Sequence, residues 1–181
     1  MKHLAMLLGV MFVYTSLAQA QTFQDLHDAV PGKYFSAANS TQTETVLTFG
    51  LETGFNTTTW LSNAFVASTY SFYSRYVVDA LTFLVVAPAG ETIAALHYAQ
   101  SGSVTCSKLC GVVSEGILLV DEIPYSLGAS PTVPRNLTIS LSGQGKTTVR
   151  AAVFIALNAF DVYPYNATMS LDSATLTVDF E

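Results

Sequence analysis

The chain has 181 residues, of which 50% are hydrophobic and only 11% are charged, and its formal net charge is −6. This acidic balance, with few and scattered basic residues, argues against nucleic acid and against anionic membranes as partners. The low charge content, well under the roughly 25% usual in soluble domains, favours an extracellular β protein or a subunit of an assembly over a free cytosolic enzyme.

The first twenty residues have the pattern of a secretory signal peptide. A basic start at Lys2 precedes an apolar run over 4–17, and the tripeptide Ala-Gln-Ala at 18–20 supplies the small residues of a cleavage site. The run is shorter than the roughly twenty apolar residues that a membrane helix needs. We therefore expect cleavage after Ala20 and a protein that is secreted to the extracellular space or the cell surface, with no membrane insertion.

Residues 21–44 form an N-terminal segment ahead of the main domain. The spacing of its apolar residues predicts one short helix over 22–29, the only helix that we expect. The stretch 31–45 is polar and rich in Ser, Thr, Ala and Asn. We interpret 21–44 as a candidate exchangeable strand, donated to the open sheet edge of a neighbouring copy.

The rest of the chain, 45–181, predicts strands. Residues 137–141 and 176–180 alternate between apolar and polar side chains, which is typical of half-buried strands, whereas the continuous apolar run 81–86 predicts a strand covered on both faces. Short segments rich in β-branched and aromatic residues are separated by Gly, Pro, Ser or Asn. This pattern predicts an all-β domain, an antiparallel β-sandwich or jelly roll. Further strand candidates are 46–49, 68–78, 92–98, 116–120 and 149–157.

The mature chain has two cysteines, Cys106 and Cys110, in the pattern C-x-x-x-C. In an oxidising compartment we expect them to form one disulfide that closes a small loop. A structural zinc site needs four ligands, so we expect no metal.

Four asparagines lie in N-x-[ST] sequons and are candidate glycosylation sites. A glycan at each position requires an exposed asparagine. The alternative is that the sequons reflect a Thr-rich composition in a protein that is never glycosylated. The four are Asn39, Asn56, Asn136 and Asn166.

No arrangement of residues predicts a catalytic site or a cofactor. Residues 142–148 look like a phosphate loop, but Ser140 occupies its first glycine position, so we expect a hairpin turn there. His27 and His97 are too few for a copper or zinc cluster, and we expect His97 to be a satisfied, half-buried side chain. Asp121 and the adjacent Glu122 are expected at an exposed strand end, where they would point to opposite faces.

Four aromatic residues are candidates for ligand binding: Trp60, Tyr73, Tyr163 and Tyr165. Sugar-binding sandwiches present such rings to pyranose faces. The alternative is that aromatic residues of one parity on a strand fill the core between two sheets.

In the polar stretch 31–45 that runs into the strand candidate 46–49 and could be exchanged between copies, the chain loosely resembles secreted β-sandwich subunits of donor-strand filaments, an architectural resemblance without a diagnostic motif. The resemblance implies a non-catalytic structural or adhesive protein whose partners are copies of itself. The alternative is a monomeric carbohydrate-binding module whose partners are extracellular glycans. A small secreted hydrolase is a third hypothesis.

Overall fold

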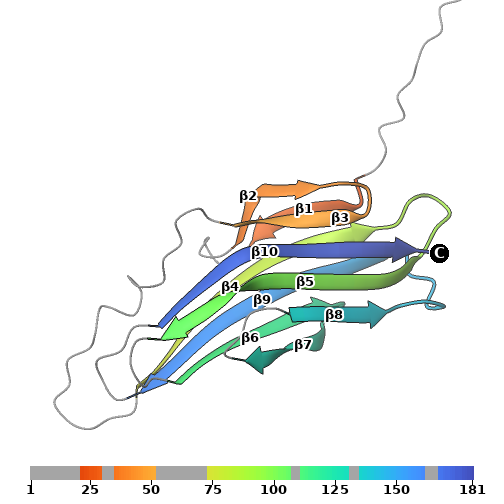
Figure 1. Cartoon of the computed structure of the whole chain (residues 1–181). Coiled ribbons are helices and arrows are strands. Elements are labelled where there is room, and N and C mark those ends of the chain that lie inside the picture. The colour runs from red at the N-terminus through yellow and green to blue at the C-terminus, as the bar shows by residue number, and fades with distance from the viewer. Residues whose placement is uncertain (1–20, 30–34, 52–72, 107–110, 131–134, 162–166) are drawn as a thin grey trace, which may run out of the picture.

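The structure is a computed structural model that describes residues 21–29, 35–51, 73–106, 111–130, 135–161 and 167–181 (Figure 1). These residues form ten strands and, within the described ranges, no helix. The strands are β1 (Phe23–Asp28), β2 (Phe35–Gln42), β3 (Val46–Leu51), β4 (Tyr73–Val86), β5 (Ile93–Cys106), β6 (Gly111–Val120), β7 (Ile123–Ser130), β8 (Arg135–Ser140), β9 (Thr148–Asp161) and β10 (Ala167–Phe180).

The strands make two antiparallel sheets of five strands each, which confirms the all-β prediction. Sheet A has the order β1-β4-β9-β6-β7, and sheet B has the order β2-β3-β10-β5-β8. From β3 onward the pairs are nested along the chain, since β3 pairs with β10, β4 with β9, β5 with β8 and β6 with β7. The edge strands are β1 and β7 in sheet A, and β2 and β8 in sheet B.

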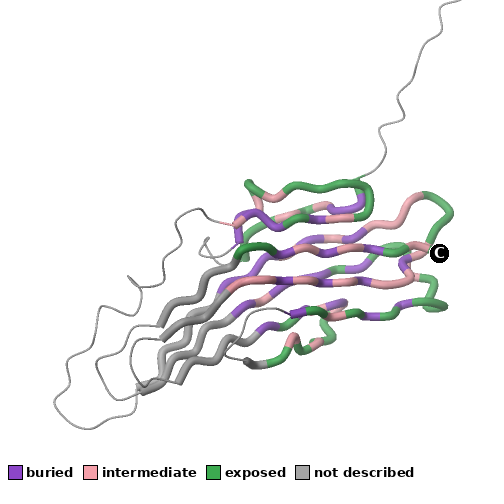
Figure 2. The backbone as a smooth tube through the Cα atoms, in the orientation of Figure 1, coloured by how far each residue is buried: buried purple, intermediate pink, exposed green. Residues whose placement is uncertain are grey.

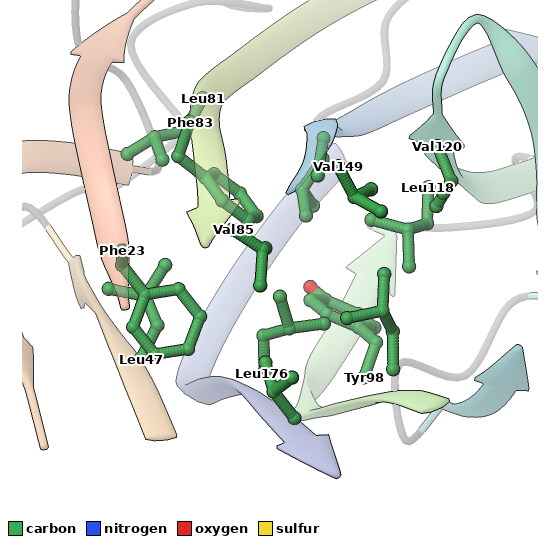
Figure 3. Packing of buried hydrophobic residues seen from close by; sticks show 14 of the residues in the cluster. Phe23, Leu47, Leu81, Phe83, Val85, Tyr98, Leu118, Val120, Val149 and Leu176 are labelled. Atoms are coloured by element: carbon green, nitrogen blue, oxygen red, sulfur yellow. The ribbon is translucent and has the colours of Figure 1, made fainter. Parts of the chain in front are cut away.

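The core lies between the two sheets and is built from the inward side chains of both (Figure 3). Aromatic rings connect the layers: the centroid of Phe83 is 6.4 Å from Phe23 and 5.9 Å from Phe49, and Phe49 is 6.0 Å from Tyr98. Edge-to-face contacts of this kind add to the free energy gained from burying the rings. The two sheets therefore stabilise each other through one continuous core.

Burial alternates along the strands, as Figure 2 shows. The alternation predicted for 137–141 and 176–180 is confirmed, because Ile139, Leu141, Leu176 and Val178 are all buried. The prediction of a strand covered on both faces at 81–86 is wrong. Leu81, Phe83 and Val85 face the core, while Thr82, Leu84 and Val86 are only half-buried on the outer face of sheet A.

The predicted helix over 22–29 is wrong, since these residues form strand β1, which pairs with β4. Its register shifts between Gln24 and His27, and Asp25 has a φ of 50°. Such a bulge adds one residue to the strand and reverses its parity. Phe23 and Leu26 therefore both contact the core, and their spacing of three residues imitates a helix.

Both strands of the 21–44 segment pair within the chain, β1 with β4 and β2 with β3. Phe23 and Phe35 are 1% and 0% exposed, so each contributes to the common core. Carboxylates of sheet A hold β2 in place: Asp79 accepts the Phe35 N–H at 2.9 Å, and Asp28 accepts the Ala37 N–H at 2.8 Å. Exchange of this segment between copies stays a prediction.

The glycine-containing turn after β8 is not a hairpin, contrary to the prediction. Gly143 and Gly145 adopt positive φ angles of 73° and 63°, which glycine reaches without strain. The chain there passes from β8 in sheet B to β9 in sheet A. It therefore links the two layers at the end of the molecule where the C-terminus lies (Figure 1).

Candidate functional site

Two of the four candidate glycosylation sites fall on described residues. Asn39 lies on β2 and Asn136 lies on β8, and both side chains are exposed. These are the two edge strands of sheet B. Asn56 and Asn166 lie outside the described residues, and the occupancy of all four sequons stays a prediction.

The other predicted site residues fall largely outside the description. Trp60, Tyr163, Tyr165 and Cys110 lie in ranges that the structure does not describe. Tyr73 is the first residue of β4 and its backbone pairs with Asp161. Cys106 is the last residue of β5 and its backbone pairs with Ala167. The side chains of Tyr73 and Cys106 are likewise outside the description, so the disulfide and the aromatic ligand site stay predictions.

A histidine on the outer face of sheet B is fully engaged by its neighbours. His97 Nε2 lies 2.8 Å from Asp179 Oδ2, and its Nδ1 lies 3.0 Å from Thr138 Oγ1. The order hydroxyl, imidazole, carboxylate is that of a nucleophile triad, but catalysis also needs N–H donors aimed at a developing oxyanion. The N–H groups of β5 and β10 are used in the sheet ladders. His97 is thus the satisfied side chain that the sequence predicted.

The other described histidine borders a hollow on the outer face of sheet A. The hollow holds about 320 Å³. His27 Nδ1 contacts the Asp25 carbonyl oxygen at 2.8 Å, and its Nε2 lies 2.7 Å from Thr82 Oγ1. The Thr82 hydroxyl also lies 3.1 Å from Nδ1, so both ring nitrogens have a polar neighbour. The lining residues are Asp25, His27, Thr82, Phe83, Leu84 and Arg150.

The two acidic residues Asp121 and Glu122 form the turn between β6 and β7, with φ angles of 48° and 70°. The Asp121 carboxylate accepts hydrogen bonds from Lys146 Nζ and, at 2.9 Å, from the Arg150 N–H. Partial burial raises the pKa of Asp121, but the hydrogen bonds from Lys146 and Arg150 outweigh it and hold the pKa below its usual value. Asp121 thus ties the β6–β7 turn to the start of β9.

The last residue, Glu181, binds the same connection from sheet B. Its carboxylate accepts hydrogen bonds from Ser142 Oγ at 2.5 Å and from the Gly143 N–H at 2.7 Å. These two hydrogen bonds lower the pKa of Glu181. Asp121 and Glu181 each act on the 142–150 stretch rather than together on one ligand, so they are structural.

A buried polar cluster lies between the sheets. The Tyr98 hydroxyl donates to Gln100 Oε1 at 2.8 Å, and Arg135 Nη1 donates to the Gly128 carbonyl at 2.9 Å. Burial raises the pKa of Tyr98 and the charge of Arg135 lowers it, with a net increase. Tyr98, Gln100 and Arg135 are each at most 5% exposed. The Arg135 hydrogen bond connects β8 to β7 across the side of the sandwich.

A second hollow, of about 560 Å³, is lined by Gln21, Thr22, Gln42, Thr43, Glu44, Pro88 and Ala89. It begins at the first described residue. Apart from Glu44, its lining side chains are uncharged. The hollow at Asp25, which brings a carboxylate, an imidazole and a guanidinium to one place, is therefore the stronger candidate for a binding site.

Over the described ranges, no group of three His, Cys, Asp or Glu side chains is placed to hold a metal ion. No helix in this part of the chain has the length and apolar character to cross a membrane. No protein-family model, curated protein or solved structure matches the chain.

Proposed function

We propose that this chain is a non-catalytic structural or adhesive protein, secreted from the cell, that assembles with copies of itself through the outer edge of β8, which pairs only with β5 among the described strands. The main support for this proposal is the regular pairing register of β8. The other three edge strands, β1, β2 and β7, each contain a register shift against their neighbour. The pairing of β8 with β5 runs without a shift from Arg135 to Ser140.

Irregular edges protect a sheet against pairing with another chain, whereas a regular edge is a template for it. The Leu141 N–H donates to the Ala94 carbonyl at 2.7 Å, so residue 141 points its backbone groups at β5. Because antiparallel strands alternate the direction of these groups, Asn136, Thr138 and Ser140 point theirs away from β5. These three residues offer the backbone donors and acceptors for an added strand.

Pairing of β8 with β8 of a second copy would extend sheet B across both molecules. This arrangement costs less free energy than donation of the 21–44 segment, because release of β1 and β2 from the domain would expose the buried side chains of Phe23 and Phe35. Burial of one such side chain contributes about 2–3 kcal/mol. The proposal includes removal of residues 1–20 as a signal peptide during export.

The proposal also includes a jelly-roll topology for the domain, which the nested strand pairs from β3 to β10 support.

A filament also needs a second contact. The outer face of sheet A offers an apolar row in which Phe154 and Ile117 are register neighbours and Leu119 follows on β6. Ile117 is 40% exposed, and the other two are half-buried. We assign the second contact to this row. The alternative of a carbohydrate module built on Trp60 and the tyrosines has no described geometry in its favour.

The Ser140→Pro variant tests whether the edge of β8 mediates self-assembly. Proline removes the N–H that points away from β5 and is tolerated on edge strands. We expect the purified variant to be monomeric by light scattering and to show no fibres by electron microscopy, with its unfolding temperature unchanged. Ser140→Ala keeps the N–H and is the matched control, which should assemble like the wild type.

Assembly of Ser140→Pro at the wild-type level would contradict the role of β8, as would a wild-type protein that is monomeric at all concentrations. Ile117→Ser separates the two contacts. We expect it to stop at dimers, since only the β8 contact is left.

A further inference from the structure

We propose that the hollow between β1, β4 and β9 on the outer face of sheet A binds a sugar that carries a carboxylate, such as a uronic acid unit of an extracellular polysaccharide. This site is separate from the β8 edge and does not depend on assembly. No sequence motif indicates it, because its residues come from three strands that meet only in the folded protein.

The bulge in β1 creates the site. Between Gln24 and His27 the strand leaves its register with β4, and Asp25 takes the left-handed conformation with a φ of 50°. Non-glycine residues in this region are uncommon, and such positions cluster at ligand-binding sites. The displaced residue lines the hollow beside Thr82 and Leu84.

Two of the polar side chains at the hollow are held in place by each other. His27 contacts the Asp25 carbonyl at 2.8 Å and the Thr82 hydroxyl at 2.7 Å. His27 and Thr82 therefore line one side of the hollow with polar groups that are oriented before a ligand binds. Preorganised polar groups reduce the ordering cost of binding.

Two charged side chains at the hollow are available to a ligand. Arg150 is exposed, and its hydrogen bonds in the described part are made by its backbone, to Asp121. Asp25 is also exposed, and its described hydrogen bond uses its carbonyl oxygen rather than its carboxylate. The Arg150 charge also acts on Asp121 and lowers its pKa, but no hydrogen bond that the structure describes uses the Arg150 guanidinium or the Asp25 carboxylate. A guanidinium and a carboxylate therefore border one space and can both bind a ligand.

A carboxylated sugar matches these groups. Guanidinium binds carboxylate with two parallel hydrogen bonds, and the Asp25 carboxylate accepts hydrogen bonds from sugar hydroxyls. The half-buried Leu84 offers an apolar surface to the C–H face of the ring. The volume of about 320 Å³ is at the small end of ligand sites, which suits one sugar ring.

Titration of the ¹⁵N-labelled protein with glucuronate, followed by NMR, tests the proposal. We expect saturable shifts of the amide signals of β1, β4 and β9, and no saturable shifts with glucose, which lacks the carboxylate. Arg150→Gln keeps most of the side-chain length and removes the charge, and should weaken glucuronate binding about tenfold or more. Asp25→Asn keeps a residue that tolerates a positive φ and should weaken binding by a similar factor.

Asp179→Asn is the matched control, because it removes a carboxylate beside the other histidine, on the opposite outer face. It should bind glucuronate like the wild type. The proposal is overturned if glucuronate causes no saturable shifts, if glucose binds as well as glucuronate, or if Arg150→Gln binds like the wild type.

Discussion

The two outer faces of the sandwich use the same kind of residue pair in opposite ways. Each face carries a histidine that contacts a threonine, His97 with Thr138 on sheet B and His27 with Thr82 on sheet A. Around His97 the strands β10, β5 and β8 keep an unbroken register from Thr175 to Asp179. Around His27 a bulge interrupts the pairing and opens a hollow.

The difference indicates that the regularity of strand pairing, rather than the type of residue, decides whether a face forms a concave site for a ligand. A regular ladder uses the backbone groups of its inner strands, so hydrogen bonding to another chain is left to an edge strand, and β8 is the regular edge of sheet B. An irregular ladder separates two strands and brings side chains from both to the border of a concave space. The edge contact of assembly and the ligand site are accordingly assigned to different sheets.

The largest loss of stability is expected from a substitution in the core that the two sheets share. Phe83 contacts Phe23 of its own sheet and Phe49 of the other, with centroid distances of 6.4 and 5.9 Å. Phe83→Ala should lower the free energy of unfolding by about 3–5 kcal/mol, because it removes buried surface and leaves a cavity. Urea denaturation measures this loss.

Leu84→Ala is the matched control, since Leu84 is the next residue on the same strand but faces outward and is half-buried. It should cost about 1 kcal/mol, in proportion to the smaller buried area. Equal costs for the two variants would contradict the assignment of the inner and outer faces of β4.

A smaller effect is expected from the two carboxylates that anchor the 142–150 stretch, Asp121 from sheet A and Glu181 from sheet B. Hydrogen bonds hold the pKa of Asp121 and of Glu181 below their usual values of 3.8 and 4.5. Their stabilisation is complete above those values and is lost as the pH falls through the lower pKa values of the folded state. Asp121→Asn should therefore cost about 1 kcal/mol at neutral pH, and the difference from the wild type should shrink in acid.

Unfolding curves measured from neutral to acidic pH test this expectation. Asp172→Asn on β10 removes one exposed negative charge and controls for the change in net charge. If the wild type and Asp121→Asn lose stability in parallel as the pH falls, Asp121 does not carry the pH dependence. Glu181→Gln tests the second carboxylate in the same way.

The smallest effect on stability is expected at the two histidines. His97→Gln and His27→Gln should each change the free energy of unfolding by less than about 1 kcal/mol, because both histidines make their side-chain contacts at the solvent-exposed surface. Only His27→Gln should weaken glucuronate binding, since only His27 borders the hollow. A weaker affinity in His97→Gln as well would mean that the two faces are not independent.

Much of the strand content could be predicted from the sequence, because alternation of apolar and polar residues follows directly from the geometry of a strand with one buried face. Leu137 to Leu141 and Leu176 to Phe180 are examples. The helix predicted over 22–29 failed for a local physical reason. A single residue in the left-handed conformation, Asp25, reversed the parity of β1 and imitated helical spacing.

The candidate binding residues could not be predicted in the same way. Nothing in the sequence around Asp25, Thr82 or Arg150 indicates that they meet, since they lie far apart along the chain. The aromatic residues that did attract a prediction, such as Trp60, lie outside the described residues.

The sequence by itself determined the fold class, because composition and periodicity set which residues must be buried and how strands alternate. It also determined the expectations of export and glycosylation, which depend on short contiguous motifs. Only the tertiary structure decided the strand order, the regular edge at β8 and the hollow at Asp25. Each of these depends on pairing between segments that lie far apart in the sequence. The free energy that favours one strand register over another comes from contacts among residues of both strands, which become neighbours only in the folded protein.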